Sequence, residues 1–125
     1  MTQVPEKLLA LRGATTCESD IASEIESKTQ ALITQMLERN SIHHDALVSI
    51  LFTATTDLHA QFPATAARGL GLGDVPLICA QELEIVDGMA RCIRVMMHFY
   101  GPQSRGDLHH IYLEGARALR DDLPA

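Results

Sequence analysis

Three arginines of this chain are suited to binding an anion, and one glutamate could itself be that anion. Arg94 lies within residues 92–100, CIRVMMHFY, a mostly apolar stretch that alternates like a β-strand. A guanidinium keeps its charge, so burying one is costly unless an anion meets it. Arg12 ends an apolar segment at a glycine, and Arg68 precedes a glycine cluster. The anion is either Glu82, in an internal salt bridge, or a ligand, and the spacing leaves both open.

Metal binding and nucleophilic catalysis have little support in the sequence. The six histidines include two adjacent pairs but form no HxxxH or HExxH pattern, and the cysteines form no CxxC pair. We therefore expect no metal site. Cys79 could act as a nucleophile, but its apolar neighbours are more typical of a small core residue. The glycines of residues 69–73, GLGLG, follow a predicted helix instead of a strand, so we expect a loop and no dinucleotide site.

Length and composition indicate one domain, over residues 1–125, in a reduced environment. The net charge of −6 disfavours a nucleic-acid partner. No apolar run is long enough to span a membrane, and the N-terminus lacks the pattern of a signal peptide. Three cysteines are an odd number, which favours free thiols and a cytoplasmic location. Eight of the ten basic residues are arginine, which reflects either recognition of carboxylates or phosphates or a compositional bias.

One long helix is predicted over residues 19–40. Ser19 or Asp20 is expected to cap its start and Asn40 to end it. Glu24 and Lys28 are spaced for an ion pair on its exposed side. An apolar stripe should face the core, and it consists of Ile21, Ile25, Leu32, Ile33, Met36 and Leu37.

Several strands are predicted around that helix. They cover residues 8–16, 47–55, 75–80 and 89–101, and the third of these reads as a buried strand. Pro63 should begin a short helix, and residues 109–120 are ambiguous between helix and strand. In the fourth strand, one face carries only core residues and the other carries Arg94, which we expect in a partly enclosed place. The fold class is therefore α+β, with a mixed sheet packed against one long helix and short helical turns.

Five short motifs, in this order, resemble the small, non-helical class of chorismate mutase. They are LRGATTCESD, ATTDLHAQFPATAAR, VPLICAQE, CIRVMMHFY and HHIYLEGARALR, and the similarity extends over residues 8–123. The resemblance implies a homotrimeric pseudo-α/β barrel with active sites between subunits. It also implies an isomerase that converts chorismate to prephenate, on the route to phenylalanine and tyrosine, by an intramolecular Claisen rearrangement without a cofactor.

The resemblance implies a catalytic role for four residues. Arg94 matches an arginine that binds the ether oxygen of chorismate, which would answer the question of its anion. Arg12 matches an arginine that binds a carboxylate and approaches the ether. Glu82 matches a glutamate that binds the ring hydroxyl and faces the developing ring cation, and Cys79 matches a cysteine near that hydroxyl, as a polar contact and not a nucleophile.

Five further residues are implied to bind the substrate. Tyr112 matches a tyrosine that binds the side-chain carboxylate. Phe62 and Arg68 match residues that wall the cleft, from the adjacent subunit. Leu119 and Arg120 fall in a C-terminal stretch that covers the site.

Several positions depart from the pattern of the family, Thr65 and Ile78 among them, and two rival functions remain as alternatives. Thr65 stands where a lysine is frequent and Ile78 where a threonine is frequent, which removes a rim charge and a hydroxyl. One rival function is a trimeric enamine/imine deaminase. The other is a non-catalytic regulatory subunit that binds a dicarboxylate.

Overall fold

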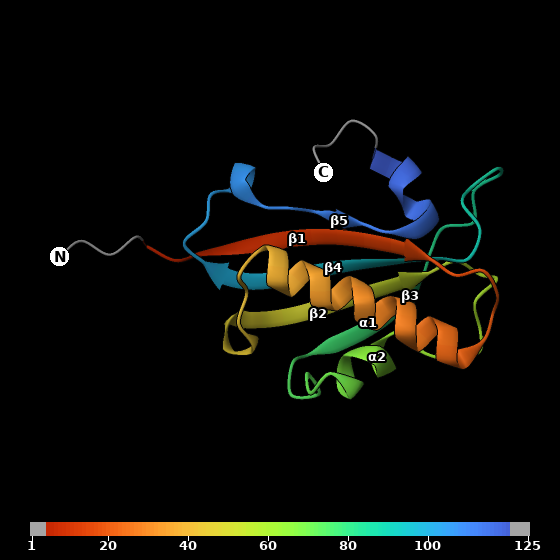
Figure 1. The fold of residues 1–125 in the computed structure, drawn as a ribbon, viewed down its shortest axis with the longest axis horizontal. Helices are drawn as coiled ribbons and strands as arrows, with labels where there is room; N and C mark the ends of the chain where they lie inside the picture. Colours follow the sequence, from red (N-terminus) through yellow and green to blue (C-terminus); the bar gives the residue numbers. More distant parts are fainter. Residues whose placement is uncertain (1–4, 121–125) are drawn as a thin grey trace.

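A mixed five-stranded sheet organises the chain (Figure 1). The computed structural model describes residues 5–120, with side chains as far as Leu119. The strand order is β3-β2-β4-β1-β5. Strand β4 lies antiparallel to both β1 and β2, whereas β3 and β5 run parallel to their neighbours. The strands are β1 (Lys7–Thr16), β2 (Leu47–Ala54), β3 (Leu77–Gln81), β4 (Cys92–Gly101) and β5 (Ile111–Tyr112). This mixed sheet confirms the predicted α+β class.

The helices pack on one face of the sheet. Helix α1 (Ala22–Arg39) crosses in front of the strands in Figure 1, and the short helix α2 (Ala64–Gly69) lies beside it. Three 3₁₀-helices complete the elements of the described residues: η1 (His44–Ala46), η2 (Arg105–Asp107) and η3 (Glu114–Arg120). The ambiguous residues 109–120 thus form the short strand β5 followed by η3. No helix in the described part combines the length and apolar character needed to cross a bilayer.

The core lies between the sheet and α1. The predicted core face of β4, formed by Ile93, Val95, Met97 and Phe99, is buried. The α1 stripe is buried at Ile25, Leu32, Ile33 and Met36. Gly13 allows the close approach of helix and strand, because a Cβ there would lie 2.6 Å from the Met36 sulfur.

The other face of the sheet is open. Side chains directly opposite each other in a ladder share a face, and the pairs of Arg94 with Thr53 and Ala14 place all three on this open face. Large apolar side chains are exposed on it: Leu8, Leu51, Ile78 and Tyr100. Neither α1 nor α2 covers this face (Figure 1).

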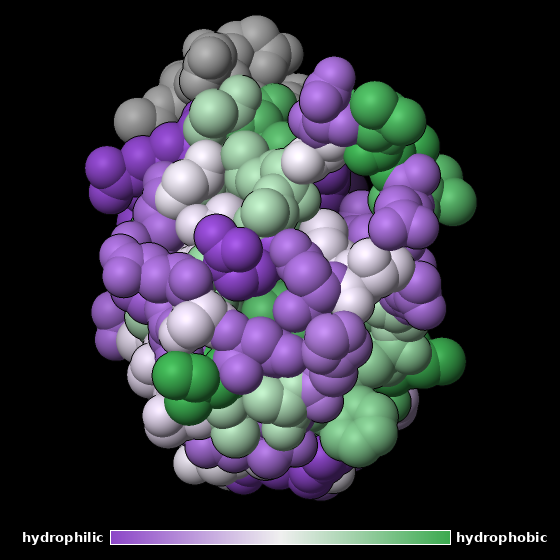
Figure 2. Space-filling view, turned by 90° about the vertical axis from the view of Figure 1, so that its right-hand side faces the viewer, coloured by the Kyte–Doolittle hydropathy of each residue, from purple (hydrophilic) through white to green (hydrophobic). Residues whose placement is uncertain are grey.

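A second group of exposed apolar side chains belongs to the loop of residues 82–91, which joins β3 to β4. Leu83, Ile85 and Val86 are each at least 65 % exposed. Figure 2 views the end of the molecule from which this loop extends, and strongly hydrophobic side chains gather at its upper edge.

Two local predictions about α1 are wrong. Its N-cap is Ile21, without a side-chain hydrogen bond. Asp20 instead accepts hydrogen bonds from the main-chain N–H groups of His59 and Ala60. On the exposed side, Lys28 lies 3.3 Å from Glu114, in an ion pair with a distant residue instead of one within the helix.

The prediction of a buried strand at residues 75–80 is also wrong. Strand β3 is an edge strand, and Ile78 is 63 % exposed. Its apolar sequence suits a strand covered on both faces, but within one chain only the helix-side face is covered.

Candidate active site

A cleft on the open face brings together four of the residues singled out in the sequence. Its volume is about 290 Å³. We call it the open-face cleft, and it is lined by Arg12, Gly13, Ala14, Leu51, Thr53, Glu82, Arg94, Val95, Met96 and Tyr112. Two cationic, one anionic and one phenolic side chain thus meet in one cleft.

Strand register explains how residues far apart in sequence reach this cleft. Arg94 on β4 pairs with Thr53 on β2 and with Ala14 on β1, and Ala14 pairs with Tyr112 on β5. These four residues form one row across the sheet. Arg12 lies two residues before Ala14 and therefore projects from the same face of β1.

Arg94 and Glu82 form an ion pair inside this cleft. The Arg94 Nε lies 3.3 Å from Glu82 Oε1, and the Thr53 hydroxyl donates to Glu82 Oε2 at 2.5 Å. Yet the Arg94 side chain remains 50 % exposed, against 20 % for Glu82. A guanidinium carries five N–H donors, so this pair does not exhaust it. The internal salt bridge exists, and Arg94 still faces a partly enclosed space that could receive a second anion.

Thr53 is a site residue that the sequence reasoning missed. The available signal was its place in the alternation of β2, on the face opposite the buried Ile50 and Phe52. Its hydroxyl fixes one carboxylate oxygen of Glu82. The main-chain N–H of Glu82 also donates to the carbonyl of Ala54, at 2.9 Å. The glutamate is therefore positioned by both its backbone and its side chain.

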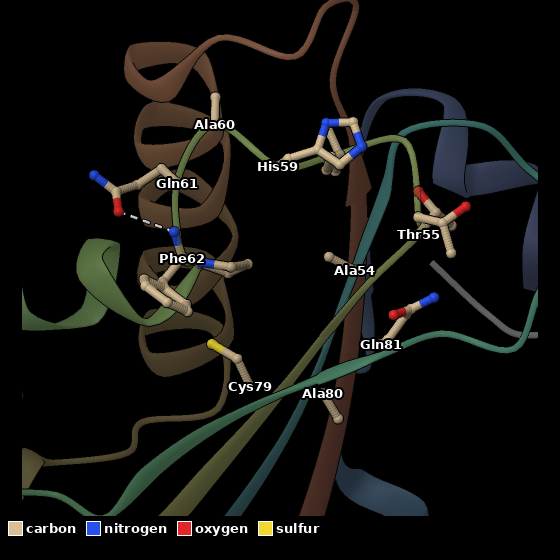
Figure 3. A pocket seen from close by; sticks show the side chains of 12 residues that line it. Ala54, Thr55, His59, Ala60, Gln61, Phe62, Cys79, Ala80 and Gln81 are labelled. Carbon is tan, nitrogen blue, oxygen red and sulfur yellow. Dashed lines mark hydrogen bonds between the residues drawn. The ribbon is translucent and has the colours of Figure 1, made fainter.

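Cys79 and Phe62 lie in a different pocket, on the helix side of the sheet. This helix-side pocket has a volume of about 440 Å³ and includes Thr55, Gln61 and Gln81 in its lining. Cys79 pairs with the buried Phe52 and packs against the core. Figure 3 shows Cys79 and Phe62 in the same pocket. Within one chain, the structure therefore does not bring Cys79 into the cleft that contains Glu82.

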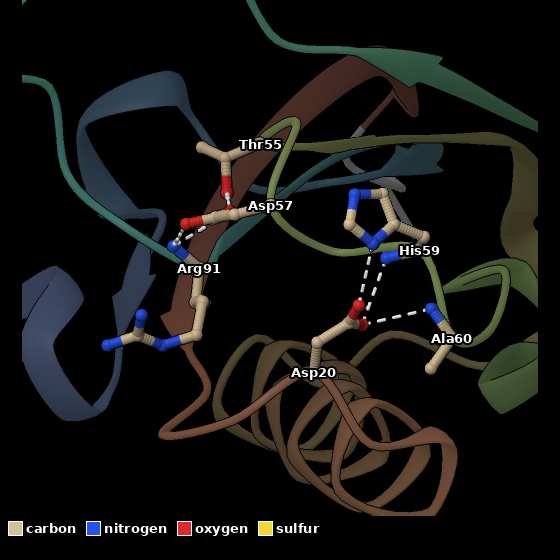
Figure 4. Close-up of polar contacts among 6 residues, drawn as sticks. All are labelled: Asp20, Thr55, Asp57, His59, Ala60 and Arg91. Atoms are coloured by element: carbon tan, nitrogen blue, oxygen red, sulfur yellow. Dashed lines mark hydrogen bonds and ion pairs between the residues drawn. The ribbon is translucent and has the colours of Figure 1, made fainter.

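Two carboxylates hold the segment of residues 55–62, which lines the helix-side pocket (Figure 4). Asp57 accepts the main-chain N–H of Arg91 with both oxygens, at 3.1 and 2.9 Å, and the Thr55 hydroxyl at 2.5 Å. Asp20 accepts the N–H groups of His59 and Ala60, each at 2.9 Å. The partners are far from these aspartates in sequence, apart from Thr55, so no local pattern predicted the contacts.

These contacts shift the pKa values of both carboxyl groups. Hydrogen bonding by the Ala60 N–H, together with the contacts of His59, lowers the pKa of Asp20. Partial burial acts to raise the pKa of Asp57, but hydrogen bonds from Thr55 and Arg91 outweigh it and the net shift is downward. Both groups therefore favour the ionised form that accepts these bonds.

The remaining predicted residues lie outside both linings. Arg68 is exposed on α2 and donates a hydrogen bond to the Thr65 hydroxyl at 3.1 Å. The threonine that replaces the frequent lysine of the family is therefore a hydrogen-bond partner of this arginine. Leu119 packs in a small cluster with Ala14 and Tyr112, next to the open-face cleft. The side chain of Arg120 lies outside the described residues.

Metal-ligating side chains do not cluster in the part of the chain that the structure describes. No group of three or more His, Cys, Asp or Glu side chains could hold a metal ion among those residues. The three cysteines are free, and burial raises the pKa of Cys17 to about 11.

Comparison with known proteins identifies the family. The model of chorismate mutase type I matches residues 8–123. The chain belongs to the chorismate mutase type I family. It is 43 % identical over 114 residues to chorismate mutase AroH of Bacillus subtilis (strain 168), covering 90 % of each chain. It is 39 % identical over 114 residues to chorismate mutase AroH of Thermus thermophilus, covering 90 % of this chain and 93 % of the relative.

A solved structure supports the same assignment. The chorismate mutase from Clostridium thermocellum superimposes with a TM-score of 0.87 at 43 % identity, covering 88 % of this chain and 98 % of that one. The function is therefore that of a chorismate mutase, an isomerase of aromatic amino acid biosynthesis whose substrate is chorismate. These comparisons give no support to the deaminase or to the regulatory-subunit hypothesis.

Proposed function

We propose that this chorismate mutase acts as a homotrimer whose active sites combine two different surfaces of neighbouring chains. One chain supplies the open-face cleft, with Arg12, Glu82, Arg94 and Tyr112. The next chain supplies Phe62 and Cys79 from its helix-side pocket, and Arg68 from the exposed surface of α2. The single observation that carries this proposal is the division of the candidate residues between two pockets on opposite faces of one sheet.

The open-face cleft has the charges that the rearrangement requires. In the transition state, the ether oxygen of chorismate gains negative charge while the ring gains positive charge. Arg94 is positioned to meet the oxygen, and Glu82 to bind the ring hydroxyl and face the ring cation. The Arg94–Glu82 ion pair keeps both groups oriented before substrate binds, so little reorganisation is needed during the reaction.

Arg12 and Tyr112 provide a binding set for the carboxylates of chorismate. They lie in the same cleft, on strands β1 and β5, which pair in parallel. Arginine suits a carboxylate because its N–H donors match the two oxygens. Holding a flexible dianion in its compact reactive conformer lowers the barrier without any covalent step.

The rim of the helix-side pocket would close the cleft of the neighbouring chain. Phe62 is 66 % exposed in the single chain, which suits an apolar wall that is covered only on assembly. Cys79 would contact the substrate as a polar neighbour of the ring hydroxyl, and Arg68 would attract the dianion. Leu119 and the C-terminal Arg120 would cover the opening.

The open face of the sheet supports the assembly itself. Leu8, Leu51, Ile78 and Tyr100 are between 36 and 63 % exposed on this one face. Large apolar side chains exposed together on one face of a sheet suit an interaction site in a protein that works in water. A further chain packed on it would bury these residues and enclose Arg94. The free thiols agree with action in the cytoplasm, which we also propose.

Mixed trimers test whether each site takes residues from two chains. Chains with Arg68→Ala and chains with Glu82→Ala, each poorly active alone, are unfolded together and reassembled in equal amounts. Random assembly gives about one site in four both intact residues, so activity should recover toward a quarter of wild type.

The matched control mixes chains with Glu82→Ala and Arg94→Ala. These residues share one cleft, so no mixed site regains both and activity should stay low. Recovery in this control, or none in verified Arg68→Ala and Glu82→Ala trimers, would contradict the proposed division.

A further inference from the structure

His110 contacts the backbone of a proposed site residue from 98 positions away in sequence. The main-chain N–H of Arg12 donates a hydrogen bond to the His110 Nδ1, at 3.0 Å. A main-chain N–H can only donate, so this nitrogen must be the unprotonated acceptor of the ring. In the neutral imidazole the proton then lies on Nε2.

The position of this bond in the sheet gives it a particular importance. Strand β5 has only two residues, and its register with β1 pairs Gly13 with Ile111 and Ala14 with Tyr112. The N–H of Leu113 continues the ladder to the Ala14 carbonyl at 2.9 Å. The pairing of β1 with β5 does not extend to Arg12, and the His110 imidazole accepts the N–H that a strand carbonyl would otherwise accept. His110 thereby extends the attachment of this segment to the residue that carries the guanidinium.

The same segment also carries Tyr112. Ile111, between His110 and Tyr112, is buried and anchors the segment in the core. Arg12 and Tyr112 line one cleft, so the geometry between them depends on how β1 and the residues before β5 are held together. A shift of the segment along β1 would move the phenol relative to the guanidinium.

We propose that His110 is a positioning residue of the chorismate mutase site, which aligns Arg12 and Tyr112 through its neutral imidazole. This inference rests on the proposed function, in which these two residues bind the carboxylates of chorismate. His110 itself need not touch the substrate. Because carboxylate binding contributes to both the ground state and the transition state, loss of alignment should raise KM more than it lowers kcat.

Kinetics of three variants test the proposal. His110→Ala removes the acceptor and should raise KM by about tenfold, the upper effect of one hydrogen bond, with a smaller change in kcat. His110→Asn places an amide oxygen near the position of Nδ1 and should restore most of the loss. His109→Asn is the matched control, because the adjacent His109 is exposed and its main chain, not its ring, bonds to Asn40. It should leave KM unchanged.

The outcomes separate this inference from the proposed function. Arg12→Ala is measured in parallel, and unchanged KM and kcat there would overturn the proposed site and this inference with it. If Arg12→Ala has a strong defect while folded His110→Ala has normal KM and kcat, the inference alone is overturned. It is also overturned if the KM of His110→Asn is no lower than that of His110→Ala. Should the variants fold poorly, ¹⁵N NMR of the wild-type imidazole decides: an unprotonated Nδ1 supports the proposal, and a proton on Nδ1 overturns it.

Discussion

Replacement of Arg94 by citrulline separates the charge of this side chain from its shape. Citrulline keeps the Nε–H that lies 3.3 Å from Glu82 but replaces one nitrogen of the guanidinium by oxygen and has no charge. If Arg94 acts mainly as a structural partner of Glu82, stability should fall and turnover should not. If it stabilises the ether oxygen, turnover should fall and the fold should survive.

The structure allows both effects to be estimated. The Arg94 side chain is 50 % exposed, and ion pairs exposed to water are worth roughly 0.2–1 kcal/mol, so the free energy of unfolding should fall by no more than about 1 kcal/mol. One donor aimed at developing charge is worth roughly 3–4 kcal/mol, which is about 100- to 1,000-fold in kcat. KM should change less, because the contact strengthens mainly in the transition state. Arg94→Lys should behave similarly, since an ammonium does not reproduce the planar fork.

The assay is the direct loss of chorismate absorbance, accompanied by sedimentation and thermal unfolding of the same samples. Wild-type turnover in the citrulline variant would rule out charge stabilisation of the ether oxygen. If the fraction of unfolded or dissociated protein is large enough to account for the lost turnover, Arg94 would instead have a structural role.

Three further predictions follow from the packing, the carboxylates and the thiol. Gly13→Ala should lower the free energy of unfolding by about 1–3 kcal/mol in urea titrations at fixed protein concentration, because its Cβ would overlap the Met36 sulfur; an unchanged midpoint would contradict this. Asp57 has a folded-state pKa below its ordinary 3.8, so its stabilisation is present above that pH and lost as pH falls below it; the difference in Tm between wild type and Asp57→Asn should shrink from pH 6 to pH 3. A constant difference would show that the charge of Asp57 is immaterial. Cys79→Ser should keep most of the turnover measured with chorismate, and complete loss would restore the nucleophile hypothesis.

The alternation of β4 made the core face of this strand and the exposed position of Arg94 predictable. Because successive side chains of a strand point to opposite faces, the sequence of residues 92–100 separated the core set from Arg94 without further information. The same rule places Arg12 on the open face of β1. The resemblance supplied the roles, which spacing alone could not, since an Arg and a Glu form salt bridges in many proteins.

Long-range contacts account for what the sequence did not reveal. Asp20 has the residue type and position of a helix cap, but its carboxylate binds main-chain groups 39 and 40 residues away. Thr53 bonds to a carboxylate 29 residues away. Ile78 reads as a core residue because local sequence does not reveal that its strand lies at the edge of the sheet, where one face stays uncovered. In each case the deciding factor is the topology of the sheet, not the nearby residues.

The position of β3 at the edge of the sheet makes its alignment a matter of catalysis as well as of folding. Edge strands are held on one side only, here by pairs such as Phe52 with Cys79. A slip by one residue would turn Cys79 outward, bring Ile78 into the core and carry Glu82 away from Arg94, because side chains alternate between faces. Ile78 is larger than Cys79, so the slip would overpack the core, and a chain that stayed folded in spite of this cost would lose both of the contributions that we propose for this strand. The specific activity per folded chain would then report the fraction of chains in which β3 has its correct register.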